Sequence, residues 1–299
     1  MKRYLLVSFF LILSSNLVLA QTPESLEQFY KSQQDAIQTS KITYFKIKTI
    51  PPLVLRGGID RVQEREDWIA DQLEMFPKVR ESGNYDPEKE KAVLETIEAF
   101  QKEMYEPRIY HQEVTYITTP AKRCQIIKKL SPGEPFEQTK VYDGEKSFLY
   151  VPHLDELHSL SNSIWLNPKQ GTCLFGADIG WRLDHGYTIA KKDGFYTLID
   201  SDGNESASFL IDPANQNAWT QMTFSHGDYV IATSDFQMEN GIPVPKVVTV
   251  HRKASDGSYY EIERMELIEA EINGVIDDDL FQTPQAEEKS SRLAKRIEH

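Results

Sequence analysis

Turn dipeptides divide the chain from Ile109 to Leu280 into short apolar or alternating segments. Glycine accepts the positive φ of a tight hairpin, so a Gly/Asp pair between two alternating runs indicates two antiparallel strands. Because this pattern recurs along the chain, it predicts an antiparallel meander. The dipeptides are Asp143-Gly144, Asp193-Gly194, Asp202-Gly203, Gly227-Asp228 and Asp256-Gly257.

The segments between these turns are rich in β-branched and aromatic residues, which favours strands. No internal repeat and no Pro/Gly/Ser-rich linker interrupts them, so one continuous sheet is favoured over two domains. The expected strands are Glu113–Thr118, Cys124–Leu130, Lys146–Val151, Gly194–Asp200, Ser206–Ile211, Asp228–Thr233, Val247–Lys253 and Tyr259–Ala270.

The part of the chain before this meander is mixed. Residues Ser25–Thr39 have apolar side chains at helical spacing, and the β-branched run Ile42–Ile50 that follows predicts a strand ending at Pro51. From about residue 58 to 105 the apolar spacing is helical again. A turn-forming stretch at Glu81–Pro87 interrupts it, with Asp86 as a helix cap, so we expect an inserted helical hairpin.

Residues 1–20 have the pattern of a secretory signal peptide. Lys2 and Arg3 precede an apolar run, and Ala20 provides a small residue at the expected cleavage site. The run is short for a bilayer core of about 30 Å, and Gln21 stands where a lipoprotein precursor would carry its lipidated cysteine. We therefore expect an exported chain that is soluble and not membrane-spanning after cleavage.

Charge and cysteine content limit the partners and the crosslinks. The formal charge is −13, and losing the positive charges of Lys2 and Arg3 would make it −15, so a nucleic acid partner is not expected. The sequence contains two cysteines, Cys124 and Cys173. In an oxidising compartment they could form one disulfide, and two separate buried thiols are the open alternative.

No arrangement of residues predicts catalysis, a metal site or a cofactor. His153 and His158 are five residues apart beside Pro152, whereas a zinc-binding helix places two histidines four apart, so we expect a solvated loop there. The chain also lacks a Gly-x-Ser-x-Gly elbow and a glycine-rich phosphate loop.

Two parts of the chain resemble the LolA-like family of periplasmic lipoprotein carriers. The first comprises Tyr116–Ile127 and Val141–Pro152, a strand-proline-strand unit followed by an Asp-Gly hairpin and an aromatic strand. The second comprises Phe209–Pro213, Gly241–Pro245 and the closing segment Ile272–Pro284. The family's classical carriers have an arginine directly before the strand proline, where this chain has Thr119. Arg123 lies at another register, so that role is not transferred to it.

The resemblance implies an α+β fold: a curved antiparallel β-sheet, or half-open β-barrel, closed by α-helices, here with the inserted helical hairpin. It implies one domain over residues 21–284, followed by a polar tail at 285–299. It further implies a periplasmic, non-enzymatic carrier that holds lipid or lipoprotein acyl chains in an apolar cavity. An interaction or sensor module with an envelope protein partner is the alternative, and an envelope hydrolase is a weaker one.

Strand alternation supplies candidates for the lining of such a cavity. Each of them could equally be an ordinary core residue, and a register change of one residue would exchange the two faces. The candidates are Phe45, Ile47, Val114, Tyr116, Phe148, Tyr150, Phe195, Phe209 and Ile211.

Overall fold

A computed structural model describes residues 22–56, 59–83, 86–130, 136–160, 175–224, 227–254 and 256–282. The expected signal peptide, Cys173 and the polar tail lie outside these residues. None of the described helices is long and apolar enough to cross a membrane.

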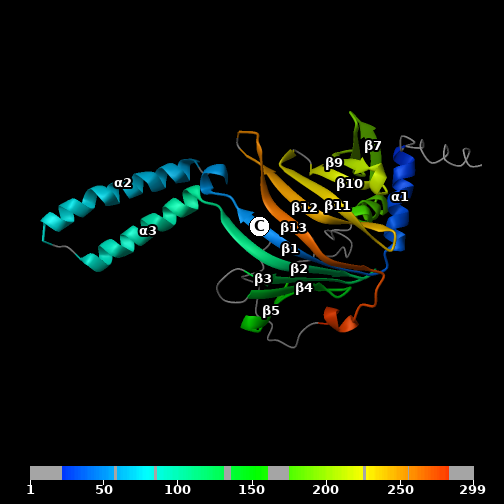
Figure 1. The fold of residues 1–299 in the computed structure, drawn as a ribbon, viewed down its shortest axis with the longest axis horizontal. Coiled ribbons are helices and arrows are strands. Elements are labelled where there is room, and N and C mark those ends of the chain that lie inside the picture. The colour runs from blue at the N-terminus through cyan, green and yellow to red at the C-terminus, as the bar shows by residue number, and fades with distance from the viewer. Residues whose placement is uncertain are drawn as a thin grey trace, which may run out of the picture.

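The described strands form one antiparallel sheet of 13 strands in the order β6-β5-β4-β3-β2-β1-β13-β12-β11-β10-β9-β8-β7 (Figure 1). The α+β fold with a single continuous sheet is therefore confirmed. The strands are β1 (Ser40–Ile50), β2 (Arg108–Thr118), β3 (Arg123–Lys129), β4 (Phe136–Tyr142), β5 (Ser147–Val151), β6 (Glu156–Ser159), β7 (Thr188–Lys192), β8 (Phe195–Ile199), β9 (Glu205–Asp212), β10 (Ala218–Phe224), β11 (Tyr229–Glu239), β12 (Ile242–Lys253) and β13 (Tyr259–Ile272).

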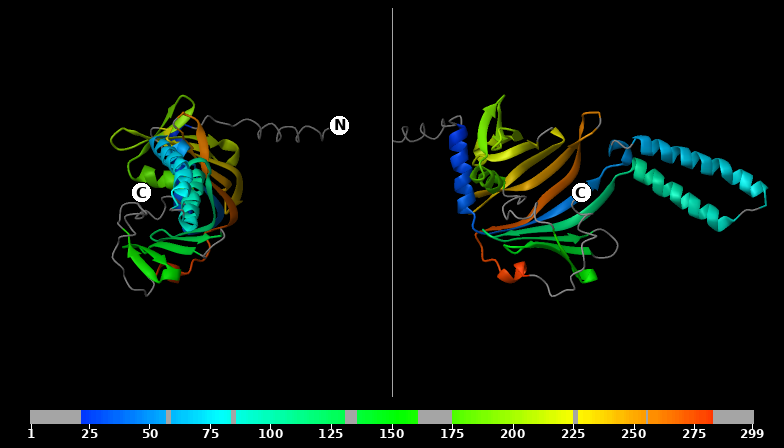
Figure 2. Two further views of the ribbon diagram at one scale, coloured as in Figure 1. Left: turned by 90° about the vertical axis from the view of Figure 1, so that its left-hand side faces the viewer. Right: turned by 180° about the vertical axis from the view of Figure 1, so that it is seen from behind.

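The first strand lies in the middle of the sheet and joins two meanders. One meander runs outward from β2 to β6, and the other runs inward from β7 to β13. Strand β1 pairs with β2 on one side and with β13 on the other, so the first and the last described strands meet at the centre of the sheet. The sheet curves strongly when viewed from its end, and β6 and β7 are its two edges (Figure 2).

The hairpin turns lie where the dipeptides predict them. Gly194 has φ +85° between β7 and β8, and Gly257 has φ +86° between β12 and β13. A side chain is strained in this conformation, which explains the glycine. Asn240 and Gly241, both with positive φ, form a further hairpin between β11 and β12 that the sequence analysis did not single out.

Several elements were not predicted from the sequence, namely β4, β6, β7, β10 and the helix α4 (Phe175–Asp184). The prediction of a solvated loop around His158 is wrong. His158 lies in β6, where it pairs with Leu149 and is only 3% exposed. Short strands of this kind have little sequence pattern of their own, and their neighbours in the sheet supply the pairing.

Two helices cover one face of the sheet. Helix α1 (Pro23–Ala36) begins at Thr22, whose hydroxyl accepts a hydrogen bond from the Ser25 amide, and it packs against α4. Apolar residues of both helices form one cluster with side chains of β7–β10, which we call the helix-covered cluster. Its buried members are Leu26, Tyr30, Ile179, Leu183, Ile189, Tyr196, Leu198, Ala207, Phe209, Trp219 and Met222.

The opposite face of the sheet has a cluster of its own, the outer cluster. It consists of buried side chains of β2–β6 and is covered by Ile276 and by Phe281 of the short helix η5 (Asp278–Phe281). This closing segment therefore packs on the face of the sheet away from α1 and α4. The buried members are Ile117, Cys124, Val141, Phe148, Leu157 and Phe281.

The inserted hairpin projects from the sheet as an arm, at the end opposite to α1 (Figures 1 and 2). Helices α2 (Ile59–Glu81) and α3 (Pro87–Tyr105) lie between β1 and β2, and Ile50, the last residue of β1, pairs with Arg108, the first residue of β2. Asp86 caps α3 as predicted. The arm has a separate small core of Leu53, Val62, Ile69, Ile97 and Met104.

Gly180 lets α1 and α4 approach closely. A Cβ added at this glycine would lie 2.5 Å from the Tyr30 carbonyl oxygen and 2.7 Å from Gln34 Oε1. Tyr30 is itself fixed, since it is fully buried and its hydroxyl donates to the Asn217 carbonyl oxygen at 2.9 Å.

We predict that Gly180→Ala lowers the free energy of unfolding by about 1–3 kcal/mol, as is typical when a packed contact is overfilled. In an uncrowded helix the same change is stabilising by roughly 0.5–1 kcal/mol. The sign of the change in unfolding free energy therefore distinguishes a close contact between α1 and α4 from an uncrowded position. Urea unfolding of both proteins measures it. A variant as stable as the parent would show that α1 and α4 do not cross here.

Candidate ligand-binding face

The face of the sheet that α1 and α4 cover, the inner face, is apolar over much of its area. A second cluster, the central cluster, continues the helix-covered cluster across β12, β13, β1 and β2. The half-buried Ile231 packs against both clusters and connects them. The buried members of the central cluster are Ile37, Ile42, Tyr44, Val114, Tyr116, Ile242, Val244, Val248, Met265 and Ile272.

Pairing registers place these side chains on one face. Tyr44 lies opposite Val114, and Ile42 lies opposite Tyr116, so the four side chains project together. The Tyr44 hydroxyl donates to the Pro245 carbonyl oxygen at 3.0 Å, which satisfies a polar group in this apolar environment.

The inner face changes from apolar to basic along β1. Ile42 and Tyr44 lie toward the α1 end, and Lys46 and Lys48 continue the same alternation toward the arm. Lys46 Nζ lies 2.7 Å from Glu263 of β13, and these side chains are only 15% and 22% exposed.

Two further basic residues lie on the inner face of the neighbouring strands. Lys140 of β4 pairs with Gln125, which pairs with Tyr116, so Lys140 shares the face of the central cluster. Arg123 of β3 lies opposite Thr118 on this face and is 4% exposed. Burial lowers the pKa of Lys140, and the positive charges of Arg123, Lys46 and Lys48 lower it further.

Two buried polar atoms of this region have no hydrogen-bond partner among the described residues. They are Ser147 Oγ and His158 Nδ1, and both side chains belong to residues that are 3% exposed. Ser147 pairs with Tyr142, which pairs with Arg123, and His158 pairs with Leu149, which pairs with Lys140. These residues therefore continue the rows that contain the two basic residues.

The predicted lining residues divide between the two faces. Val114 and Tyr116 lie in the central cluster, and Phe209 and Ile211 lie in or against the helix-covered cluster. The other candidates have the opposite orientation. Phe148 and Tyr150 pack in or against the outer cluster, Phe45 and Ile47 pair with the outward-facing Glu113 and His111, and Phe195 is 38% exposed. That any of them contacts lipid remains a prediction.

Cys124 lies in the outer cluster, where burial raises the pKa of its thiol to about 12. A disulfide with Cys173 and two separate thiols both remain open, because Cys173 is not among the described residues. Within the described ranges no group of three or more His, Cys, Asp or Glu side chains is arranged to hold a metal ion.

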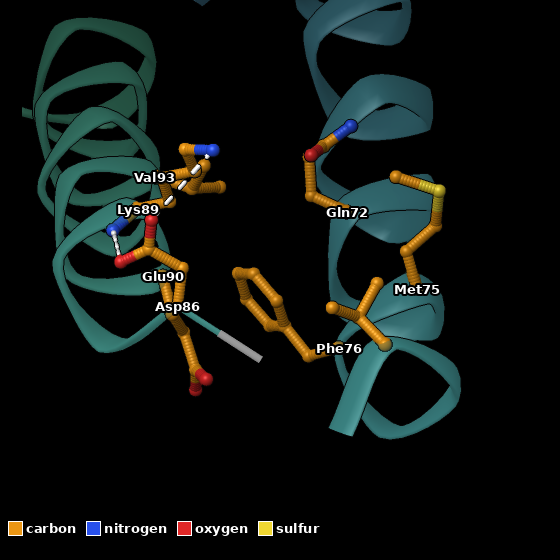
Figure 3. A pocket seen from close by; sticks show the side chains of 8 residues that line it. Gln72, Met75, Phe76, Asp86, Lys89, Glu90 and Val93 are labelled. Atoms are coloured by element: carbon orange, nitrogen blue, oxygen red, sulfur yellow. Dashed lines mark hydrogen bonds and ion pairs between the residues drawn. The ribbon is translucent and has the colours of Figure 1, made fainter. Parts of the chain in front are cut away.

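The arm contains an apolar cleft between its two helices. Phe76 of α2 extends into the space facing Val93 of α3, and Met75 lies beside it (Figure 3). The cleft has a volume of about 210 Å³ and is bordered by Asp86, Lys89 and Glu90. Leu73, Met75 and Leu94 are each more than two-fifths exposed, so the arm presents apolar surface to solvent.

Comparison with known proteins finds similarity in structure only. No family model and no curated protein matches the chain. A DUF1329 family protein from Desulfovibrio piger is similar with a TM-score of 0.46 and 11% identity, over 88% of this chain and 98% of that one. A LolA superfamily protein from Nitrosomonas europaea has a TM-score of 0.44 and 11% identity, over 88% and 98% of the two chains. An uncharacterised conserved protein from Thermus thermophilus has a TM-score of 0.37 and 9% identity, over 90% and 99%. The second of these structures belongs to the superfamily that the sequence resembles.

Proposed function

We propose that this protein is an exported, non-enzymatic carrier that holds the acyl chains of a lipid or lipoprotein against the inner face of its curved sheet. The observation that carries the proposal is the continuous apolar surface formed by the central and helix-covered clusters, joined at Ile231. Transfer of acyl chains to such a surface is favourable by about 0.8 kcal/mol per buried methylene. An acidic exterior would keep the loaded carrier soluble.

A ligand reaches this face only if part of its cover moves. Helices α1 and α4 are that cover over β7–β10, where their apolar side chains share one cluster with the strands. Because the two helices also pack against each other, we expect them to move away from the strands as a unit. Half-buried side chains at the margin of the central cluster, such as Ile127 and Leu267, provide the first apolar contacts.

We predict that Ile127→Gln weakens binding of an uncharged acyl lipid about tenfold, equivalent to about 1.4 kcal/mol. Ile127 of β3 packs against the central cluster, so an amide there opposes the burial of acyl chains. The measurement is displacement of diphenylhexatriene from the delipidated protein by dioctanoylglycerol.

The neighbouring Ile126→Gln is the matched control, because Ile126 is also half-buried on β3 but packs against the outer cluster. It should lose comparable stability and keep the parent affinity. Equal effects of the two substitutions, or no binding by the parent, would contradict the proposed function.

The arm supports a second candidate function, an interaction module that binds an envelope protein partner. The exposed Leu73 and Leu94 and the cleft around Phe76 favour it. The arm has its own core and joins the sheet through one pair of strand ends, so the two functions are separable by deletion.

Replacing residues 51–107 by an Asn-Gly turn should leave the sheet folded, because Ile50 and Arg108 are already paired. A carrier that binds lipid on the inner face keeps its dioctanoylglycerol affinity within about twofold. Circular dichroism verifies the fold of the shortened chain. Loss of lipid binding in a folded variant would assign the lipid site to the arm instead.

A further inference from the structure

The inner face is not uniformly apolar, although it belongs to a chain with a net charge of −13. Along β1 it carries Ile42 and Tyr44 first and then Lys46 and Lys48. Across the strands, Lys140 and Arg123 share the face with Tyr116 and Thr118. Basic side chains thus border the central cluster, where an acyl chain would lie.

We propose, on the basis of the proposed function, that Lys46, Lys48, Lys140 and Arg123 bind the anionic head group of the lipid. These residues are the basic set. The ligand class is then an acyl lipid with a phosphate or carboxylate head group, its chains on the central cluster and its head group at the basic set.

The gathering of basic side chains supports this assignment. Lys46 forms an ion pair with Glu263 at 2.7 Å. Arg123, Lys46 and Lys48 lie near enough to the half-buried Lys140 to lower its pKa. A cluster of basic groups in a partly desolvated place is typical of a functional site, and a phosphate or carboxylate is the group that such side chains bind.

The neighbouring polar atoms support it independently. Ser147 Oγ and His158 Nδ1 are buried and have no hydrogen-bond partner among the described residues, whereas His158 Nε2 lies 3.2 Å from the Glu156 carboxylate. An unpaired buried polar atom costs about 1–3 kcal/mol, so such atoms call for a partner. Ser147 lies in the pairing row of Arg123 and His158 in that of Lys140, so the oxygens of a head group at the basic set are suited to this polar environment.

Two lipids that differ only in head group test the proposal. Dioctanoyl phosphatidic acid carries a phosphate, whereas dioctanoylglycerol has the same chains without it. We expect the parent protein to bind the phosphatidic acid at least tenfold more tightly, because charge-assisted hydrogen bonds to phosphate add to the apolar contacts. Lys140→Gln should reduce this preference at least threefold and leave the dioctanoylglycerol affinity unchanged.

Lys128→Gln is the matched control, since Lys128 is a lysine of the adjacent strand that pairs with Glu113 on the outer face. It should keep the full preference. Equal binding of the two lipids by the parent overturns the head-group proposal and leaves the carrier function standing, whereas failure to bind either lipid overturns the carrier function. Displacement of the phosphatidic acid by an equal concentration of inorganic phosphate would show a site for free phosphate and would also overturn the proposal.

Stability measurements separate a binding role from a structural one. Burial and the charges of Arg123, Lys46 and Lys48 lower the pKa of Lys140, so the folded chain holds this proton less tightly than the unfolded chain. The other titratable groups of this face are Glu263, paired with Lys46, and His158 with the neighbouring Glu156. Stability should then rise with pH toward the unfolded lysine value of about 10.5. Lys140→Gln should melt no lower than the parent at pH 7, with the difference shrinking as pH rises. A lower melting temperature together with an unchanged lipid preference would make Lys140 a structural residue.

Discussion

The antiparallel pairing of β1 with β2 on one side and β13 on the other is the constraint on which the rest of the structure depends. Side chains alternate between the faces of a strand, so this register assigns each residue of the central strands to the inner or the outer face. It places Tyr44 with Val114 and Lys46 with Gln112. The apolar cluster, the basic set and the outer cluster all follow from that assignment.

The two faces are completed by different parts of the chain. Helices α1 and α4 cover β7–β10 on the inner face, where Gly180 permits their close approach. The closing segment with Phe281 covers β2–β6 on the outer face. The central cluster continues the same apolar face across β12, β13, β1 and β2, and its members are buried as well. The arm adds a separate core without contributing to either cluster.

Much of this fold could be predicted from local sequence because turn chemistry and helix caps are local. Gly194 and Gly257 mark hairpins whose backbone requires positive φ, and Asp86 caps α3 through its own side chain.

Local sequence does not predict in the same way which face of the sheet each side chain of a strand occupies. In the run Ile42-Thr43-Tyr44-Phe45-Lys46-Ile47, each alternation contains two apolar or aromatic residues, and only the pairing with β2 places Tyr44 inward and Phe45 outward. On the other side of β1, an extra residue of β13 opposite Thr43 and Tyr44 shifts the register between β1 and β13. The basic set was missed for the same reason, since Lys140 becomes a neighbour of the apolar face only through three successive strand pairings.

The central claim, that acyl chains bind the inner face, can be tested with the tryptophans that the chain already contains. Trp219 is 2% exposed in the helix-covered cluster, and Trp68 packs in the arm. Two single-tryptophan proteins would be compared, one retaining Trp219 and the other Trp68, with every other tryptophan replaced by phenylalanine. Titration with a lipid brominated on its acyl chains should quench Trp219 fluorescence at saturating lipid and leave Trp68 unchanged. Quenching of Trp68 with none at Trp219 would contradict the account and place the acyl chains in the arm.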